Sequence, residues 1–263
     1  MIARERLVNL LLPLATVTIL ILFWHYGIKL FQVPAYLVPS PLSVLEALNR
    51  GLIGGTLWPH ILATLTAIVT GYIVGCTMAL VISALVSEFD ILERAVYPVI
   101  VGFQSIPKVA LAPILVVWFG FDLGSKVVMV ALICFFPCFV NAVIGLKSYS
   151  PELIDLYRAF GASRWQIFWR VKVPSAAGHI FAGLQISVIL ALLGTVVAEL
   201  VASRRGLGHV IAASGLDFDV AMMFACVVIL ATMGVLASQT ILLIHRRIVF
   251  WESRSAASTV VGH

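Results

Sequence analysis

The sequence predicts an all-α membrane protein with six transmembrane helices, and its composition is the first reason. Of the 263 residues, 62% are hydrophobic and 11% are charged, and the mean hydropathy is +1.10. Soluble domains carry about 25% charged residues, so this chain has too few ionic groups to cover a surface in water. The second reason is that its apolar residues form runs near the roughly 20 residues that a spanning helix needs.

Six spans are predicted within a single domain of residues 1–263, over residues 7–31, 60–86, 91–120, 125–146, 174–202 and 221–244. The first run follows Arg4 and Arg6, as in a signal peptide. At about 25 residues, however, it exceeds the roughly 7–15 of a signal peptide's apolar region, so we interpret it as a retained span. The third run contains Pro98, Pro107 and Pro113, which predicts one crossing made of kinked or discontinuous pieces.

A short amphipathic helix is predicted between the first two spans, over residues 42–52. Ser40 can act as its N-cap, and Pro41 occupies the first helical position, where a missing N–H is harmless. The segment mixes Leu and Val with Glu46, Asn49 and Arg50, so it is too polar to cross. We expect it to lie on the outer membrane surface.

The Lys and Arg residues stand mostly at the ends of apolar runs, which favours a membrane protein over a nucleic-acid-binding one despite the pI of 9.2. Six spans put both termini on one side. With the termini inside, the inner segments hold Arg4, Arg6, Arg94, Lys147, Arg158, Arg164, Arg170, Lys172, Arg246, Arg247 and Arg254, and the outer ones hold Lys29, Arg50, Lys126, Arg204 and Arg205. This excess predicts cytoplasmic termini and a cytoplasmic segment 147–173, and it leaves Lys108 at membrane depth.

Segment 147–173 predicts a pair of short helices. Ser150, Pro151 and Glu152 form a helix start, and Leu153, Leu156, Tyr157 and Phe160 then share one face up to Gly161. Ser163 and Gln166 have the spacing of a capping box that opens the second helix, with Trp165, Phe168 and Trp169 on one side. Two hypotheses remain: the pair rests on lipid headgroups through Arg158, Arg164, Arg170 and Lys172, or it docks into a groove of a cytoplasmic partner.

This segment resembles the cytoplasmic signature of binding-protein-dependent ABC transporter permeases, in the spacing of Gly161 and Pro174. Asp155-Leu156-Tyr157 stands where that signature has Glu-Ala-Ala. The nitrate/sulfonate/taurine/bicarbonate branch is further indicated by Leu37-Val38-Pro39-Ser40-Pro41, Trp118-Phe119-Gly120, Gly161-Ala162-Ser163, Ala198-Glu199-Leu200 and Gly206-Leu207-Gly208.

The resemblance implies a type I ABC importer permease fold in a bacterial inner membrane. It also implies a second copy of the permease, two ATPase subunits that bind ATP and Mg, and an extracytoplasmic substrate-binding protein. The chain itself has no phosphate-loop motif, so we expect no catalytic residue, cofactor or metal in it. The expected ATPase-docking residues are Asp155, Tyr157, Arg158, Phe160, Gly161, Ala162, Ser163 and Trp165.

Ionisable groups at membrane depth are expensive and are functional hypotheses by default. Lys108, beside the Pro107 break, either snorkels to an interface or lines a path for an anion. For Glu199 we favour a structural or gating role, accepting hydrogen bonds from backbone amides near the turn at residues 206–208. The predicted substrate path comprises Gln104, Ser105, Pro107, Lys108, Asn141, Gln185 and Glu199.

The expected substrate is a small anion or organic acid, nitrate-, sulfonate- or taurine-like, and the alternative is a pyrimidine, flavin or aromatic compound. A secondary transporter driven by an ion gradient would need more carboxylates within its spans. A membrane enzyme would need a cluster of His or acids, which the sequence lacks. Residues 203–220 form an outer loop that is either a solvated connection or a contact for the binding protein. The four cysteines are expected to pack as small apolar groups.

Overall fold

The computed structural model describes the backbone of residues 2–251, and the side chains within that range except those of residues 2–10, 13, 14, 90 and 202. Arg254 lies outside the described residues, as do the side chains of Arg4 and Arg6. The elements are α1 (Ile2–Leu30), α2 (Pro41–Ile53), α3 (Trp58–Glu88), α4 (Asp90–Gln104), η1 (Lys108–Leu111), α5 (Ala112–Phe119), α6 (Leu123–Lys147), α7 (Pro151–Ala159), α8 (Arg164–Ile167), η2 (Phe168–Lys172), α9 (Val173–Ala202), α10 (Leu207–Leu216) and α11 (Val220–Ile248). Residues 2–251 contain no strand, which confirms the all-α prediction.

Four helical stretches are long and apolar enough to cross a membrane: Trp58–Glu88, Leu123–Lys147, Arg164–Val201 and Val220–Ile248. Ile91–Gln104 and Lys108–Phe119 pass the same test together but are bent by 84°, so the predicted discontinuous crossing is present. Among the described residues, α1 contributes the apolar helix Ala15–Leu30, which is shorter than these spans. The count of six spans therefore stays a prediction.

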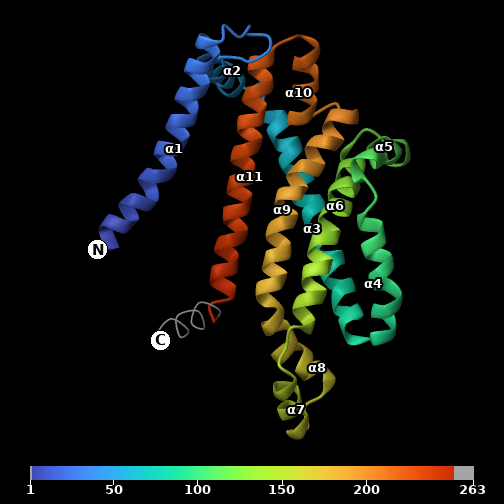
Figure 1. Ribbon diagram of the computed structural model, residues 1–263. Coiled ribbons are helices and arrows are strands. Elements are labelled where there is room, and N and C mark those ends of the chain that lie inside the picture. The colour runs from blue at the N-terminus through green and yellow to red at the C-terminus, as the bar shows by residue number, and fades with distance from the viewer. Residues whose placement is uncertain (1, 252–263) are drawn as a thin grey trace.

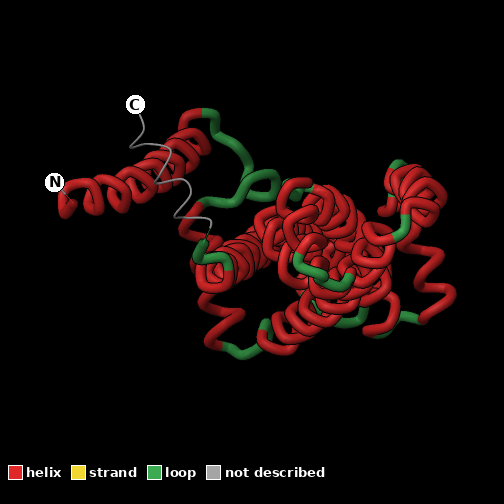
Figure 2. Tube along the Cα trace, turned by 90° about the horizontal axis from the view of Figure 1, so that it is seen from below, coloured by secondary structure: helices red, strands yellow, loops and turns green. Residues whose placement is uncertain are grey.

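The long helices α3, α6, α9 and α11 run side by side, and α6 packs along both α3 and α9 (Figure 1). Helix α1 leans away from this bundle, which the view from below also shows (Figure 2). The pair α7 and α8 projects from one end of the bundle, while α2 and α10 lie at the opposite end (Figure 1). The arrangement therefore separates the predicted docking segment from the predicted outer elements.

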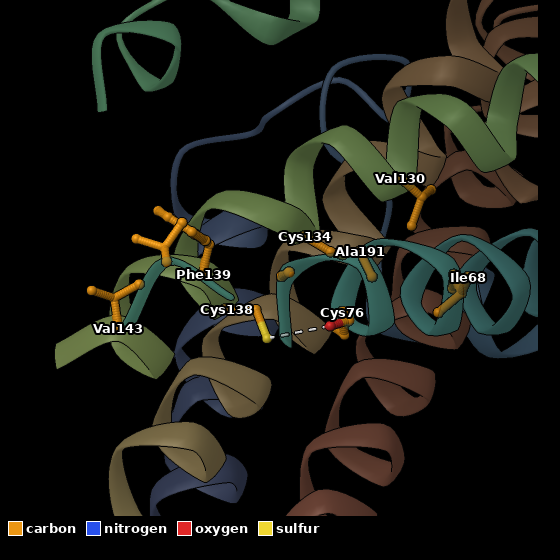
Figure 3. Close-up of a cluster of buried hydrophobic side chains, with 10 residues drawn as sticks. Ile68, Cys76, Val130, Cys134, Cys138, Phe139, Val143 and Ala191 are labelled. Atoms are coloured by element: carbon orange, nitrogen blue, oxygen red, sulfur yellow. Dashed lines mark hydrogen bonds between the residues drawn. The ribbon is translucent and has the colours of Figure 1, made fainter. Parts of the chain in front are cut away.

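Small side chains allow α3, α6 and α9 to approach closely. Ala79, Cys134, Cys138 and Ala191 are fully buried in this core, which also contains Phe139 (Figure 3). The Sγ atom of Cys138 lies 3.9 Å from the carbonyl oxygen of Cys76. Close packing of small residues is the usual source of helix association in membranes, where lipid removes the hydrophobic driving force. The buried, free cysteines agree with the expectation that they pack as small apolar groups.

Helix α2 forms as predicted. The Ser40 hydroxyl accepts a hydrogen bond from the backbone N–H of Ser43 at 3.1 Å, and Pro41 begins the helix. Val44 and Ala47 bury the apolar face against Ala225 of α11, where Trp24 and Phe224 also pack. The position of α2 is thus fixed by α11 and by the end of α1.

The third crossing breaks at one proline only. Pro98 remains inside α4, and Pro113 lies in the first turn of α5, where proline fits without loss of a hydrogen bond. The chain leaves the helical path at Ser105–Pro107 before the short helix η1. The predicted discontinuous crossing is therefore interrupted directly before Lys108, while Pro98 and Pro113 stay within helices.

Candidate functional site

Gly161 terminates α7 in a left-handed conformation, with φ of 74°. Its N–H donates to the carbonyl of Arg158 at 2.9 Å, and the N–H of Ala162 donates to that of Tyr157 at 3.0 Å. This is a Schellman motif, which favours glycine because a side chain would be strained at this φ. A Cβ atom at Gly161 would meet no atom within 4 Å, so the constraint is conformational rather than steric.

The capping of the two helices agrees with the prediction for α8 and differs for α7. In α8, Ser163 and Gln166 form the predicted capping box, with Ser163 N–H to Gln166 Oε1 at 2.8 Å. In α7, Ser150 occupies the N-cap position without a capping hydrogen bond, because its hydroxyl donates to the Glu152 carboxylate instead. That hydrogen bond lowers the pKa of the exposed Glu152.

The buried side of the helix pair differs from the predicted face. Ile154, Ile167 and Val171 form a small core, and Tyr157 packs against it, so Tyr157 turns inward. Leu153 and Leu156 remain exposed, and Phe160 is 83% exposed. Helical spacing identified apolar positions, but it did not identify Ile154 as the residue that meets the second helix.

The aromatic side of α8 and η2 is likewise divided. Phe168 is buried against Leu146 and Ala176 in the bundle, whereas Trp165 and Trp169 are exposed. The Trp165 ring lies 6.0 Å from the Phe168 ring and 5.5 Å from the Trp169 ring, centroid to centroid. Two exposed tryptophans thus pack beside one buried ring at the end of the bundle.

A cleft of about 510 Å³ opens between the two short helices. Of the predicted docking residues, Tyr157, Phe160, Gly161 and Ala162 line it, together with Leu156, Gln166 and Arg170. Asp155 and Arg158 form an exposed ion pair at 3.5 Å. The segment therefore offers a cleft with both apolar and polar walls and a basic residue, Arg170, of a size that admits side chains of a partner.

In the predicted third crossing, the structure brings Gln104, Lys108 and Asn141 together around a cavity of about 450 Å³, which lies between the α4–η1 break, α6 and α9. Ser105 and Pro107 stand at the two sides of the break: Ser105 is the C-cap of α4, and Pro107 is the N-cap of η1. Gln185 lies apart, because its amide donates to the Ser238 hydroxyl of α11 at 3.3 Å. Sequence reasoning missed Phe136 and Pro137, which also line the cavity but resemble their apolar neighbours in the sequence.

Glu199 is 1% exposed and is the centre of a buried polar network. Its carboxylate accepts hydrogen bonds from the Thr64 hydroxyl at 2.9 Å and from the Gly208 N–H at 3.0 Å. The second bond confirms the predicted interaction with the turn at residues 206–208. Gly206 has φ of 127°, and a Cβ atom there would collide with the Glu199 carboxylate, so this turn requires glycine.

Lys126 completes the network, a role that the sequence did not predict. Its ammonium lies 3.1 Å from Glu199 Oε1 and donates to the carbonyl of Arg205 at 2.6 Å, and the residue is 5% exposed. The sequence pattern places Lys126 in an outer segment, because it stands at the beginning of a predicted span. It is instead the buried counter-ion of Glu199. The two residues are 73 positions apart, so a local sequence pattern does not predict that they pair.

The comparisons with known proteins agree with this arrangement. A family model described as "Binding-protein-dependent transport system inner membrane component" matches residues 71–250. The chain belongs to this family. It is an ABC transporter permease, and the family that the sequence resembles is confirmed.

Relatives of the permease are named as transport permeases for different compounds. It is 38% identical to the riboflavin transport system permease protein RibX of Chloroflexus aurantiacus, over 90% of this chain and 89% of the relative. It is 34% identical to the formylaminopyrimidine transport permease protein ThiX of Halalkalibacterium halodurans, over 89% and 93%. It is 28% identical to the taurine transport system permease protein TauC of Escherichia coli, over 92% and 90%.

A solved structure shares the fold. The permease superimposes on a chain of the MetNI methionine ABC transporter in an inward-facing conformation, with a TM-score of 0.61 and 21% identity, over 76% of this chain and 97% of the other. This supports the predicted type I importer permease fold.

Replacing Lys126 alone should destabilise the permease strongly. Lys126→Ala leaves the Glu199 charge buried without its partner, which costs about 3–5 kcal/mol in comparable sites. Lys126→Met combined with Glu199→Gln should recover most of this loss, because the amide oxygen of the introduced glutamine still accepts from the Gly208 N–H. Arg50→Ala, which breaks the exposed ion pair with Asp219, is the matched control and should change stability by about 1 kcal/mol or less.

Thermal unfolding of the purified variants in detergent measures these effects. A Lys126→Ala variant as stable as Arg50→Ala would show that the buried pair contributes nothing to the fold.

Proposed function

We propose that two copies of this permease form the substrate path of an ATP-binding-cassette importer in a bacterial inner membrane. Two separate ATPase subunits bind ATP and Mg and dock on the Gly161 segment, and an extracytoplasmic binding protein delivers the substrate. Both termini lie in the cytoplasm, and lipid covers the outer apolar surface. The observation that carries the proposal is the exposed apolar surface of α7 and α8, which projects from one end of the bundle (Figure 1).

Alternating access needs a connection between the docked ATPase and the membrane path, and ion pairs supply one. Lys172, at the end of η2, pairs with Glu88 at the end of α3 at 2.6 Å. Lys147, at the end of α6, pairs with Glu93 in the first turns of α4. Both lysines flank the docking segment, and both acids flank the turn between α3 and α4. A displacement of α7 and α8 is thereby transmitted to α4, which leads directly to the break at Lys108.

Two states a few kcal/mol apart suffice for this cycle, because ATP and the loaded binding protein then shift the population. Helix α4 is the element best suited to move. It makes few contacts with the bundle, and Ile91, Val99 and Phe103 on it are exposed. The α3–α6–α9 unit is held by the Glu199 network and moves as one body.

A small organic anion is the substrate class that Lys108 favours. The alternative, a flavin, pyrimidine or aromatic compound, is favoured by the relatives, because RibX and ThiX are more similar to this chain than TauC is. Mass spectrometry of the ligand held by the cognate binding protein distinguishes them.

Gly161→Val should abolish docking of the ATPase. A β-branched residue is strongly disfavoured at positive φ, so the Schellman turn and the cleft beside it must rearrange. Gly55→Val is the matched control, because Gly55 also has positive φ and open surroundings but lies after α2. Copurification of the ATPase and uptake in cells are measured. Normal values for both in Gly161→Val would refute the docking assignment.

Charge reversal tests the proposed connection to α4. Glu93→Lys and Lys147→Glu each place like charges together at the inner end of α4, so uptake per ATP hydrolysed should fall several-fold while the ATPase still copurifies. The double variant restores opposite charges and should recover most of the coupling. Proteoliposome assays of uptake and hydrolysis give this ratio, and equal coupling in all three variants and the wild type would contradict the connection.

A further inference from the structure

Among the described residues, the cavity at the broken crossing holds a cation without an acidic partner. Lys108 Nζ donates to the carbonyl oxygen of Gln104 at 3.0 Å and lies 4.6 Å from the centroid of the Phe136 ring. The ion pairs between described side chains do not include Lys108. An ammonium has three donors, so at least one remains for a ligand after these contacts.

Lys108 is partly buried and stands in the predicted third crossing, where a charge is costly, and its contacts offset only part of that cost. A carbonyl oxygen and an aromatic face both stabilise a cation, and neither neutralises it. The buried lysine of the same protein, Lys126, has a carboxylate at 3.1 Å. The contrast indicates that the ammonium of Lys108 is available to bind an anionic ligand transiently.

The rest of the cavity is suited to an organic body. Its walls are mainly apolar, formed by Ile133, Phe136, Pro137, Val140, Ile186 and Leu190. Pro137, inside α6, has no N–H to donate to the carbonyl of Ile133, so this wall lacks one helical hydrogen bond. The amide of Asn141 donates to the Pro137 carbonyl at 2.8 Å and adds a polar group at the same place. A small hydrated inorganic anion would lose water here and gain no apolar contact.

We propose that this cavity is a transit site for a small organic anion with a planar apolar body, an aromatic carboxylate or sulfonate. The anionic group binds Lys108 Nζ, and the body lies against Phe136 and Pro137. The inference rests on the proposed function in taking the cavity as part of the substrate path. It goes further by assigning the site within the permease and its ligand chemistry. Binding is expected to be weak, because a transported molecule must leave.

The test uses the full chain in lipid nanodiscs, without ATPase, and radiolabelled benzoate as the probe. Benzoate should bind, and benzenesulfonate should displace it. Benzamide, which has the same shape without the charge, and nitrate, which has charge without the body, should not. Lys108→Gln should weaken benzoate binding about tenfold or more, since it removes a charge-assisted hydrogen bond. Phe136→Leu should reduce the preference for benzoate over cyclohexanecarboxylate.

Two variants control for folding and for other sites. Lys108→Arg keeps the charge and should retain binding. Lys29→Gln removes a lysine from the larger apolar pocket on α1 and should bind benzoate as the wild type does. The proposal is overturned if the wild type fails to bind benzoate at millimolar concentration, if Lys108→Gln binds it normally, or if benzamide competes as well as benzenesulfonate. Because ATPase docking is measured separately, its failure would refute the importer function without affecting this result.

Discussion

The buried ion pair between Lys126 and Glu199 is the interaction on which the arrangement of the bundle depends. Two charges removed from water are costly unless they are paired and their remaining hydrogen-bonding capacity is filled. Here Thr64 of α3, Lys126 of α6 and the start of α10 all converge on the carboxylate of α9. Leu207 N–H in turn donates to the Thr64 hydroxyl at 2.8 Å. One polar centre thus joins the spanning helices of the core to the outer helix α10.

In the proposed mechanism, α4 moves relative to a core formed by α3, α6 and α9. The docking segment continues into this core through η2 and α9, and its flanking lysines reach the turn between α3 and α4. Helix α4 leads to the break at Pro107 and to the cavity beside Lys108. The site where a partner would act and the site where a substrate would pass are therefore connected by one short arm rather than by the whole bundle.

Features that depend on neighbouring residues could be predicted from the sequence. The caps at Ser40 and Ser163 and the turn at Gly161 follow from local hydrogen bonds. A break in the third crossing is also predicted, but a missing N–H does not by itself locate the break, because Pro98 and Pro137 remain inside helices. Contacts between distant residues could not be predicted in the same way. Lys126 occupies the position of an ordinary interfacial lysine, and Phe136 that of an ordinary apolar residue. Gln185 is predicted to line the path, yet it is directed to Ser238 because α11 lies on that side.

The relative motion of α4 and the core is the most direct test of this mechanism. Spin labels on cysteines introduced at the exposed positions Ile91 of α4 and Ile189 of α9 give the distance between α4 and the core. A second pair, at Ile73 of α3 and Ile189, gives a distance within the core. Double electron–electron resonance spectroscopy of the complex with its ATPase measures both distances with and without bound ATP. The first distance is predicted to change while the second stays constant. Equal changes in both, or a constant first distance during normal transport, would contradict a mobile arm on a rigid core.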